Sequence, residues 1–398
     1  MEFQGYARPD GSVGIRNMVA IIPASRCANE MACRIADEAG AGVHPLLHNK
    51  PCIHTGPDNE MSLRTLIGLG KNPNVYAALI IGIGCDPFSC EDMASEVATT
   101  GKPVEALTIE KEGDYDIVVE KGINFCKQMK ADAALQTRQP FDITHIKLAV
   151  KCGGSDTTSA LGCNPVAGWA VDQIVNGGGA AVFSETAELV GAEHIVARRA
   201  TDPAVAQKVL DAVGRTDQRI LDAGVDILGS EPTPGNIKGG LTSIEEKALG
   251  AIAKTGSAPL TDVLDWGQKL PGPGLYFMDG SANTPPMQLG LAASGAQMMT
   301  FGFGGGLPAS FRSMPAGSMG NLPILPVIKI LSSPKAAKEI PYFDVYAGGI
   351  IEGSESVDVV GQRLMDVIRD TASGKPTKIE MRPRYRDVLE VWRIGPAF

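Results

Sequence analysis

Three cysteines stand at or near the ends of strand-like runs, where their thiols could take part in chemistry. Cys85 follows the continuous apolar run VYAALIIGI, and Cys152 follows the shorter run IKLAV. Cys52 lies beyond a weaker strand candidate and shortly after His48. Parallel strands present their carboxyl ends at one edge of a sheet, where ligand crevices form. Three thiols at such an edge could bind iron directly or hold an iron–sulfur cluster.

An inert place in the core is the alternative for every thiol, because free cysteine is among the most buried residue types. Helical patterns favour this structural role for Cys33 and Cys126, and it is also favoured for Cys90 and Cys163. For Cys27, a structural role and a functional role both remain open. The chain has eight cysteines and no recognisable export signal, so we expect reduced thiols in a cytoplasmic protein.

A glycine-rich turn directly follows Cys152. It consists of Gly153, Gly154, Ser155 and Asp156. Such turns bring backbone N–H groups close to a ligand and favour anions, so the turn is a candidate site for a substrate carboxylate or phosphate. The alternative is an ordinary backbone turn that binds no ligand, because glycine-rich turns of this kind are common.

Three residues are candidates for proton transfer. Glu185 directly follows the strand-like run 180–183, and His194 follows a few residues later. Either could act as general base or acid if its pKa is tuned toward neutrality. The alternative is a capping Glu185 and a solvated His194. His48 is the third candidate.

Strand-like and helix-like segments alternate along the chain, which predicts a parallel sheet. We predict an α/β fold of mostly parallel, Rossmann-like sheets with helices on both faces. The length favours two domains, 1–140 and 141–398, joined by the polar stretch 135–142. A Gly- and Pro-rich segment near 301–323 is too long for a simple connection and is predicted to be an active-site loop.

Charge and hydropathy exclude two classes of partner. The net charge of −9 comes from dispersed acids, and no run of Lys and Arg could track a phosphate backbone, so we expect no nucleic-acid binding. No apolar stretch approaches the ~20 residues that span a bilayer, so we expect no membrane insertion.

Several segments in one order resemble the large domain of the altronate and galactarate dehydratase family. The resemblance runs nearly the full chain and is carried by GYARPDGSVGIRN (5–17), KCGGSD (151–156), SET (184–186), GAEH (191–194) and GNIKGGLTSIEEK (235–247). It implies an iron-dependent hydro-lyase that removes water from a sugar acid to leave a 2-keto-3-deoxy acid. A metal that chelates the substrate would acidify the α-carbon and stabilise the enediolate. On this hypothesis Cys85 and Cys152, with Cys52 and His48, bind iron as Fe²⁺ or a cluster.

The same family contains the large subunit of sulfolactate sulfo-lyase, which is the alternative function. SDTTS (155–159), GPGLYFMD (272–279) and PILPVIKI (323–330) resemble that branch, whereas His48 with Cys52 and the run Gly84-Cys85-Asp86 resemble the sugar-acid dehydratases. A non-catalytic iron or redox protein, or a binding subunit, is a further alternative.

Two departures from the family bear on the substrate. An arginine expected in a Thr-Gly-Arg-Gly-like turn is missing at 303–306, and Arg312 is the candidate to replace it in binding a carboxylate. The family's acidic residue after Asp279 is replaced by the stretch 283–286 (NTPP). The chain also starts at the large domain, so we expect a separate small subunit, and we expect a homo-oligomer.

Overall fold

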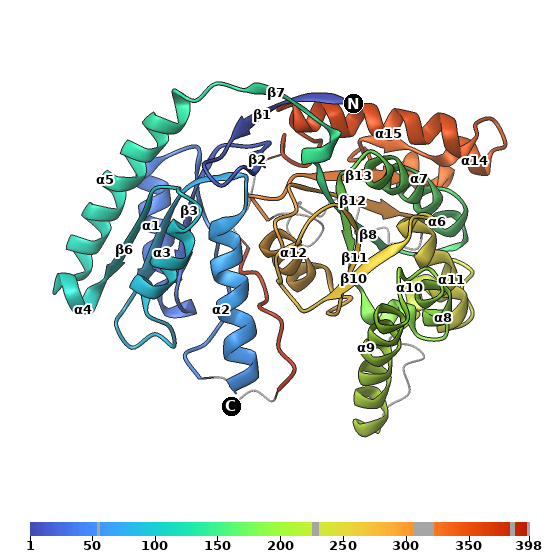
Figure 1. The fold of residues 1–398 in the computed structure, drawn as a ribbon, viewed down its shortest axis with the longest axis horizontal. Coiled ribbons are helices and arrows are strands. Elements are labelled where there is room, and N and C mark those ends of the chain that lie inside the picture. The colour runs from blue at the N-terminus through green and yellow to red at the C-terminus, as the bar shows by residue number, and fades with distance from the viewer. Residues whose placement is uncertain (54–55, 225–230, 306–321, 383–386, 396–398) are drawn as a thin grey trace.

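The computed structural model describes residues 1–53, 56–224, 231–305, 322–382 and 387–395, which form two lobes around separate sheets (Figure 1). The sheet of the N-terminal lobe has four parallel strands in the order β4-β3-β5-β6. These strands are β3 (Met18–Pro23), β4 (Val43–Pro45), β5 (Val75–Gly82) and β6 (Val104–Thr108). Nearly all of β5 is buried, as its continuous apolar run predicts for a strand covered on both faces.

Helices cover both faces of this smaller sheet. The helices α1 (Asn29–Ala39) and α5 (Tyr115–Ala134) pack on one face, and α2 (Gly56–Lys71) and α3 (Cys90–Ala98) pack on the other. The short α4 (Ile109–Glu112) precedes α5. The long helix α5 continues through Gly122, where a Cβ atom would lie 2.7 Å from Ile35 Cδ1. Gly122 therefore permits the close approach of α5 to α1 rather than interrupting the helix.

The C-terminal lobe is built on a seven-stranded sheet in the order β10-β11-β9-β8-β12-β13-β14, parallel throughout. Its strands are β8 (Lys147–Gly153), β9 (Ala180–Phe183), β10 (Leu260–Leu264), β11 (Gly274–Met278), β12 (Met298–Phe303), β13 (Val327–Leu331) and β14 (Val345–Tyr346). From β8 the chain adds β9 on one side of the sheet, and later it adds β12, β13 and β14 in turn on the other side. The switch point between β8 and β12 is where open α/β sheets form ligand crevices.

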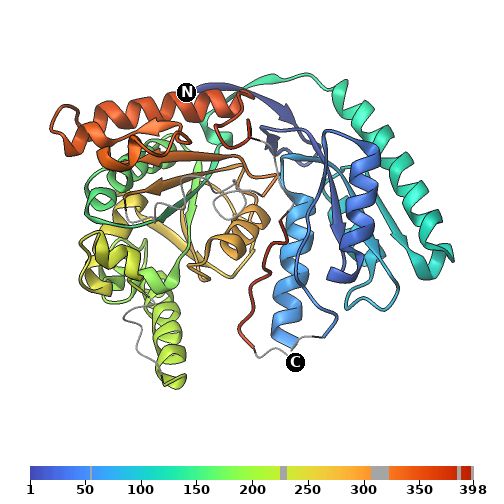
Figure 2. The ribbon, with the colours of Figure 1, turned by 180° about the vertical axis from the view of Figure 1, so that it is seen from behind.

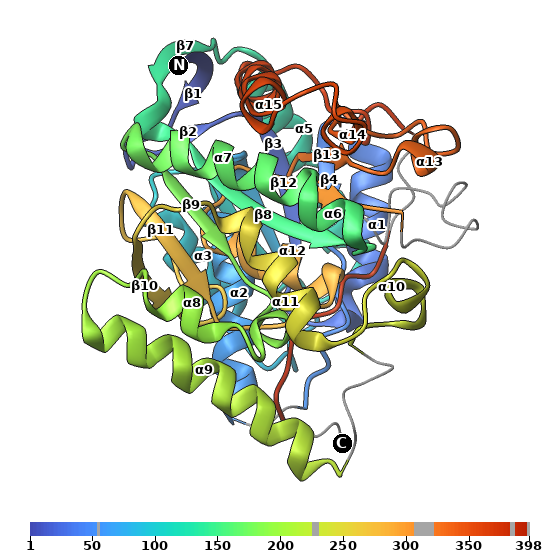
Figure 3. The same ribbon diagram turned by 90° about the vertical axis from the view of Figure 1, so that its right-hand side faces the viewer.

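The helices of this lobe also lie on both faces of its sheet. They are α6 (Thr157–Leu161), α7 (Cys163–Asn176), α8 (Glu193–Ala197), α9 (Pro203–Asp222), α10 (Pro234–Lys238), α11 (Ile244–Ile252), α12 (Thr284–Ala293), α13 (Pro334–Ala337), α14 (Gly348–Ile351) and α15 (Val357–Ala372). Figure 3 shows α6, α7 and α11 on the outer face. On the inner face, α12 packs against α2 of the other lobe, where a Cβ on Gly68 would lie 2.6 Å from Ala293 O. The lobes thus share one apolar core.

Both ends of the described chain cross the boundary predicted near residue 140. The strand β1 (Glu2–Ala7) pairs antiparallel with β2 (Val13–Gly14) and β7 (Gln139–Asp142), so part of the predicted linker is a strand. Phe3 packs in the core of the C-terminal lobe. At the other end, the N–H of Leu389 donates to the carbonyl of Leu47 over 2.9 Å, and this tail runs along α2 (Figure 2).

The fold class predicted from the sequence is confirmed. The Gly- and Pro-rich segment begins differently from the prediction: residues 301–303 complete β12, Gly304 and Gly305 follow, and 306–321 lie outside the described residues. Among the described helices, none combines the length and the apolar character that crossing a membrane requires.

Candidate active site

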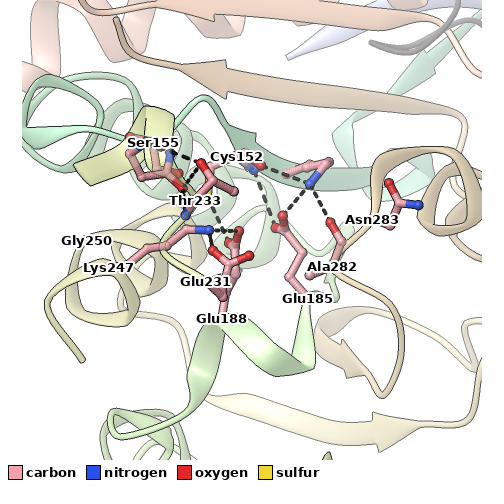
Figure 4. A network of polar contacts seen from close by, with 12 residues as sticks. Cys152, Ser155, Glu185, Glu188, Glu231, Thr233, Lys247, Gly250, Ala282 and Asn283 are labelled. Carbon is pink, nitrogen blue, oxygen red and sulfur yellow. Dashed lines mark hydrogen bonds and ion pairs between the residues drawn. The ribbon is translucent and has the colours of Figure 1, made fainter. Parts of the chain in front are cut away.

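Two neighbouring strands of the large sheet end in charged residues that meet. Val150 of β8 lies opposite Phe183 of β9, so the end of β8 lies beside Glu185, just past the end of β9. Successive strand residues point to opposite faces, so Lys151 and Cys152 approach Glu185 from two sides. Lys151 Nζ lies 2.5 Å from Glu185 Oε1, and the Cys152 N–H donates to Glu185 Oε2 over 3.5 Å (Figure 4).

Glu185 adopts an unusual backbone conformation that directs it to this position. Its φ of 77° and ψ of 54° place it in the left-handed region, and no other described residue except glycine has a positive φ. This conformation costs an L-residue about 1–2 kcal/mol. The following turn holds it in place, because the Thr186 N–H donates to Gly280 O over 3.1 Å and the Gly280 N–H donates to Thr186 Oγ1 over 2.8 Å. Strain held by its surroundings is typical of functional sites.

The ammonium group of Lys254 lies at the centre of the cluster. Lys254 belongs to a 3₁₀ turn, Ala253–Thr255, and is 1% exposed. Its Nζ lies 2.9 Å from Glu185 Oε2 and 3.4 Å from Cys152 Sγ. It also lies 3.6 Å from Glu188 Oε2. One cation therefore contacts two carboxylates and a thiol.

A third lysine, Lys247, closes the cluster on the far side. Glu188 belongs to the 3₁₀ turn Thr186–Leu189, and its Oε1 lies 3.0 Å from Nζ of Lys247 on α11. Lys247 also pairs with Glu231 (Figure 4). Three buried lysines thus face three glutamates, which offsets the cost of removing each charge from water.

Burial and pairing set the protonation states. Burial raises the pKa of the Cys152 thiol well above its ordinary value, and Glu188 adds to this effect, so the thiol stays protonated at neutral pH. Burial also acts to raise the pKa of Glu188, but Lys247 and Lys254 outweigh it and hold that pKa well below its ordinary value. For Lys254, burial acts to lower the pKa, but the surrounding carboxylates outweigh burial and the pKa is raised.

The cluster contains a set of metal-ligand atoms, but a lysine already binds them. Cys152, Glu185 and Glu188 each offer an atom within 4.8 Å of the others, the only such set among the described residues. Lys254 Nζ contacts all three residues, so in this arrangement an ammonium group occupies the position between the ligand atoms. An iron–sulfur cluster needs several thiolates, and one cysteine is present. The residues as arranged do not fit iron.

The sequence of the whole chain matches known proteins. Residues 5–134 match the family model for the second domain of D-galactarate dehydratase/altronate hydrolase, and residues 143–396 match the C-terminal model of D-galactarate/altronate dehydratase. The chain belongs to the D-galactarate/altronate dehydratase family. This membership identifies it as a lyase.

Individual relatives carry two kinds of name. The (2R)-sulfolactate sulfo-lyase subunit beta of Chromohalobacter salexigens is 36% identical over 95% of this chain and 94% of its own. The altronate dehydratase of Escherichia coli is 30% identical over 99% of this chain and 78% of its own. The galactarate dehydratase (L-threo-forming) of the same organism is 28% identical over 99% and 77%.

In this dehydratase-family chain, the predicted anion-binding turn lies beside the cluster. Asp156 caps α6, because its Oδ1 accepts from the Ser159 N–H over 2.8 Å, and its Oδ2 accepts from the Gly305 N–H over 2.6 Å. Both oxygens of the Asp156 carboxylate thus bind backbone N–H groups of the protein itself. Gly154 has a φ of +55°, so it supplies a bend that glycine favours, just after Gly153 ends β8. Ser155 Oγ is buried and has no hydrogen-bond partner among the described residues, so it has a free donor for a ligand.

Two predicted residues are not brought to the cluster. His194 is exposed on α8, and its side chain makes no hydrogen bond or ion pair with any residue that the structure describes. Arg312 lies outside the described residues.

The other predicted ligands lie at the strand ends of the N-terminal lobe. Cys52 and Cys85 are exposed, and neither joins Cys152 in a set of close ligands among the described residues. His48 is buried, with Nε2 2.8 Å from Pro23 O and Nδ1 accepting from the Lys50 N–H over 3.2 Å. Burial lowers the pKa of His48 to about 4, so the ring is neutral with its proton on Nε2. A role for His48 in catalysis stays a prediction and requires one of these bonds to break.

Five residues of the cluster were given no role from the sequence: Lys151, Glu188, Glu231, Lys247 and Lys254. Lys151 carries a detectable signal, a charge directly after the apolar run Leu148–Val150 of its strand. Lys254 has none, because it follows a short helix and reaches the cluster only through the packing of its 3₁₀ turn against α7.

Proposed function

We propose that this chain is a hydro-lyase that removes water from a sugar acid or related 2-hydroxy acid to give a 2-keto-3-deoxy acid. The observation that carries the proposal is the buried Lys151–Glu185 contact at the ends of β8 and β9, beside the switch point of the sheet. A carboxylate and an ammonium group held together in a desolvated site can act as base and electrophile for one substrate.

The reaction needs two bonds to break. On this proposal Glu185 takes the proton from the α-carbon, and the electron pair of that C–H bond forms a double bond to the β-carbon. The β C–O bond breaks with its electron pair, and a proton from Lys151 completes the departing water. The enol then becomes the 2-keto acid, and the ammonium groups of Lys151 and Lys254 stabilise the negative charge that develops meanwhile.

A sulfo-lyase acting on 3-sulfolactate is the second candidate. It is supported by the 36% identity to the sulfo-lyase subunit beta, against 30% and 28% for the two dehydratases of Escherichia coli. The same proton abstraction would then expel sulfite by breaking a C–S bond. The word subunit in that relative's name also supports our proposal of a separate small partner subunit.

Iron dependence is a separate proposal that the resemblance supports and the position of Lys254 opposes. If Lys254 supplies the cationic charge, turnover should survive prolonged dialysis against a chelator. Metal analysis of protein purified without oxygen, followed by assays with and without added Fe²⁺, tests this point.

One experiment tests the reaction class. The chain, with and without the small subunit, is incubated with altronate, galactarate and (2R)-sulfolactate, and keto acid is measured with semicarbazide and sulfite separately. Keto acid without sulfite supports the hydro-lyase, and equal amounts of both support the sulfo-lyase. Lys151→Ala should abolish either signal, while the exposed control Lys208→Ala should retain it. No keto acid from any of the three acids contradicts both functions.

A further inference from the structure

Lys151 belongs to a row of three side chains that crosses the centre of the large sheet. Phe301 of β12 lies opposite Lys151 of β8 and opposite Lys329 of β13. Residues in register point to the same face, and Phe301 packs in the core that both lobes share. Lys151 Nζ lies 5.7 Å from the ring centroid of Phe301, and Lys329 Nζ lies 6.0 Å from it.

The two lysines of this row differ in their partners. An ammonium group has three N–H donors, and those of Lys151 face Glu185 Oε1, the carbonyl of Cys152 at 3.0 Å and the carbonyl of Ala282 at 3.2 Å. Lys329 is 5% exposed, and its ammonium group makes no hydrogen bond or ion pair with any residue in the described ranges. Burying an unpaired cation costs several kcal/mol. A lysine retained under this cost needs an explanation.

The carboxylate of Asp344 lies nearby, but it does not pair with the Lys329 ammonium group and so does not explain why this lysine is buried. Asp344 Oδ2 accepts from the backbone N–H of Lys329 over 2.8 Å, and Asp344 Oδ1 accepts from the backbone N–H of Lys378 over 2.8 Å. Asp344 thus binds the backbone of Lys329 and not its ammonium group. The other charged group that acts on Lys329 is Arg382, a second cation.

Arg382 adds an unused donor to the same place. Its guanidinium stacks on the ring of Tyr342, with Cζ 3.5 Å from the centroid. Its Nη1 is buried and has no partner among the described residues. Arg382 acts electrostatically on Lys329, both cations have free N–H groups, and no carboxylate pairs with either in the described chain, so the two form a site for an anion.

We propose that Lys329, with Arg382 as a second donor, binds an acidic group of the substrate other than the carboxylate next to the reacting carbon. This inference rests on the proposed lyase function and deepens it. The strands β8 and β13 lie two strand spacings apart, roughly 10 Å, so an anion at Lys329 is remote from the carbon that faces Glu185 and Lys151. The substrate is therefore a diacid whose second acidic group is a carboxylate at the far end of a longer carbon chain.

The test compares acids that carry one or two acidic groups. The diacid probe is galactarate, which has a carboxylate at each end of its chain, and the monoacid probe is altronate. A charge-assisted hydrogen bond contributes about 1.5–3 kcal/mol, so Lys329→Met should raise KM for the accepted diacid about 10- to 100-fold and leave kcat within about 3-fold. Lys329→Arg should restore part of the affinity, and the exposed neighbour Lys335→Met is the matched control.

The pH dependence gives a second readout. Burial lowers the pKa of Lys329 to about 8, with Asp344 acting against this shift and Arg382 adding to it. KM for the diacid should therefore rise above pH 8 in the wild type and stay flat in Lys329→Met. Removing an unpaired buried charge should not lower the free energy of unfolding, so the variant should remain folded in urea titrations.

The outcomes separate this inference from the proposed function. Turnover of galactarate with an unchanged KM in Lys329→Met overturns the inference and leaves the lyase function standing, as does a preference for altronate or (2R)-sulfolactate. If no acid is turned over, the lyase function fails. Calorimetric titration of galactarate then decides the inference, since binding to the wild type and not to Lys329→Met supports it, and equal or absent binding to both overturns it.

Discussion

The carboxyl ends of the two parallel sheets use their polar residues in different ways. In the C-terminal lobe, Glu185 joins residues from different elements, since it contacts Lys151 on β8 and Lys254 on a distant 3₁₀ turn. In the N-terminal lobe, Asp86 closes its own loop, accepting from the N–H groups of Ile83 at 2.6 Å and Gly84 at 3.0 Å.

This difference shows what a position at a strand end does and does not imply. Both sheets bring side chains to a common edge, as parallel topology requires. In the N-terminal lobe, Asp86 accepts from the backbone of its own loop and from the Ser25 hydroxyl, and His48 binds backbone groups of Pro23 and Lys50, so both bind uncharged partners. In the described part of the C-terminal lobe, three lysines and three glutamates form a buried set of charges that pair across elements. We therefore expect substitutions there to affect both turnover and stability.

The largest expected effect belongs to Glu185→Ala. This change leaves Lys151 and Lys254 buried without their shared carboxylate, and breaking a buried pair costs about 3–5 kcal/mol. Loss of a general base lowers kcat about 10²- to 10⁴-fold. Urea unfolding and keto acid assays measure the two effects, with the exposed Glu120→Ala as control. Glu185→Gln keeps the shape and should lose turnover with a smaller loss of stability. Wild-type turnover in Glu185→Gln would falsify the role of Glu185 as base.

A smaller effect on stability is expected at His48. Its folded pKa of about 4 lies below the unfolded value of about 6.5, so the unfolded chain binds more protons between these values. Stability from this residue is therefore complete above pH 6.5 and declines as the pH falls toward 4, by up to about 3 kcal/mol.

Urea titrations at several pH values check this expectation. The wild type should lose more stability between pH 6.5 and pH 4.5 than His48→Gln does. The exposed His194→Gln should follow the wild type. Parallel curves for all three proteins would show that His48 titrates normally in the folded state.

The sequence allowed much of this fold to be predicted, since its elements follow local patterns. The strand at β5 and the placement of Cys152 and Glu185 at strand ends came from apolar runs and their boundaries. The centre of the site could not be predicted, because Lys254 reaches Cys152 across about a hundred residues of chain through helix packing. Strand ends also do not reveal which way a side chain faces, and so Cys52 and Cys85 were grouped with Cys152 although the structure leaves them exposed.

The last prediction concerns these thiols and should leave stability unchanged. Thiol reagents attack the thiolate, so Cys52 and Cys85, which are exposed, should react with DTNB in the native protein. Cys152 is buried, and its raised pKa keeps it protonated, so it should react only on unfolding. Mass spectrometry of the labelled peptides assigns each site, with the exposed Cys27 as reference.

The same labelling sharpens the iron prediction for the N-terminal lobe. Anaerobic Fe²⁺ added before DTNB should protect Cys52 and Cys85 together if both bind iron, while leaving Cys27 reactive. Protection of neither would remove iron binding from this lobe.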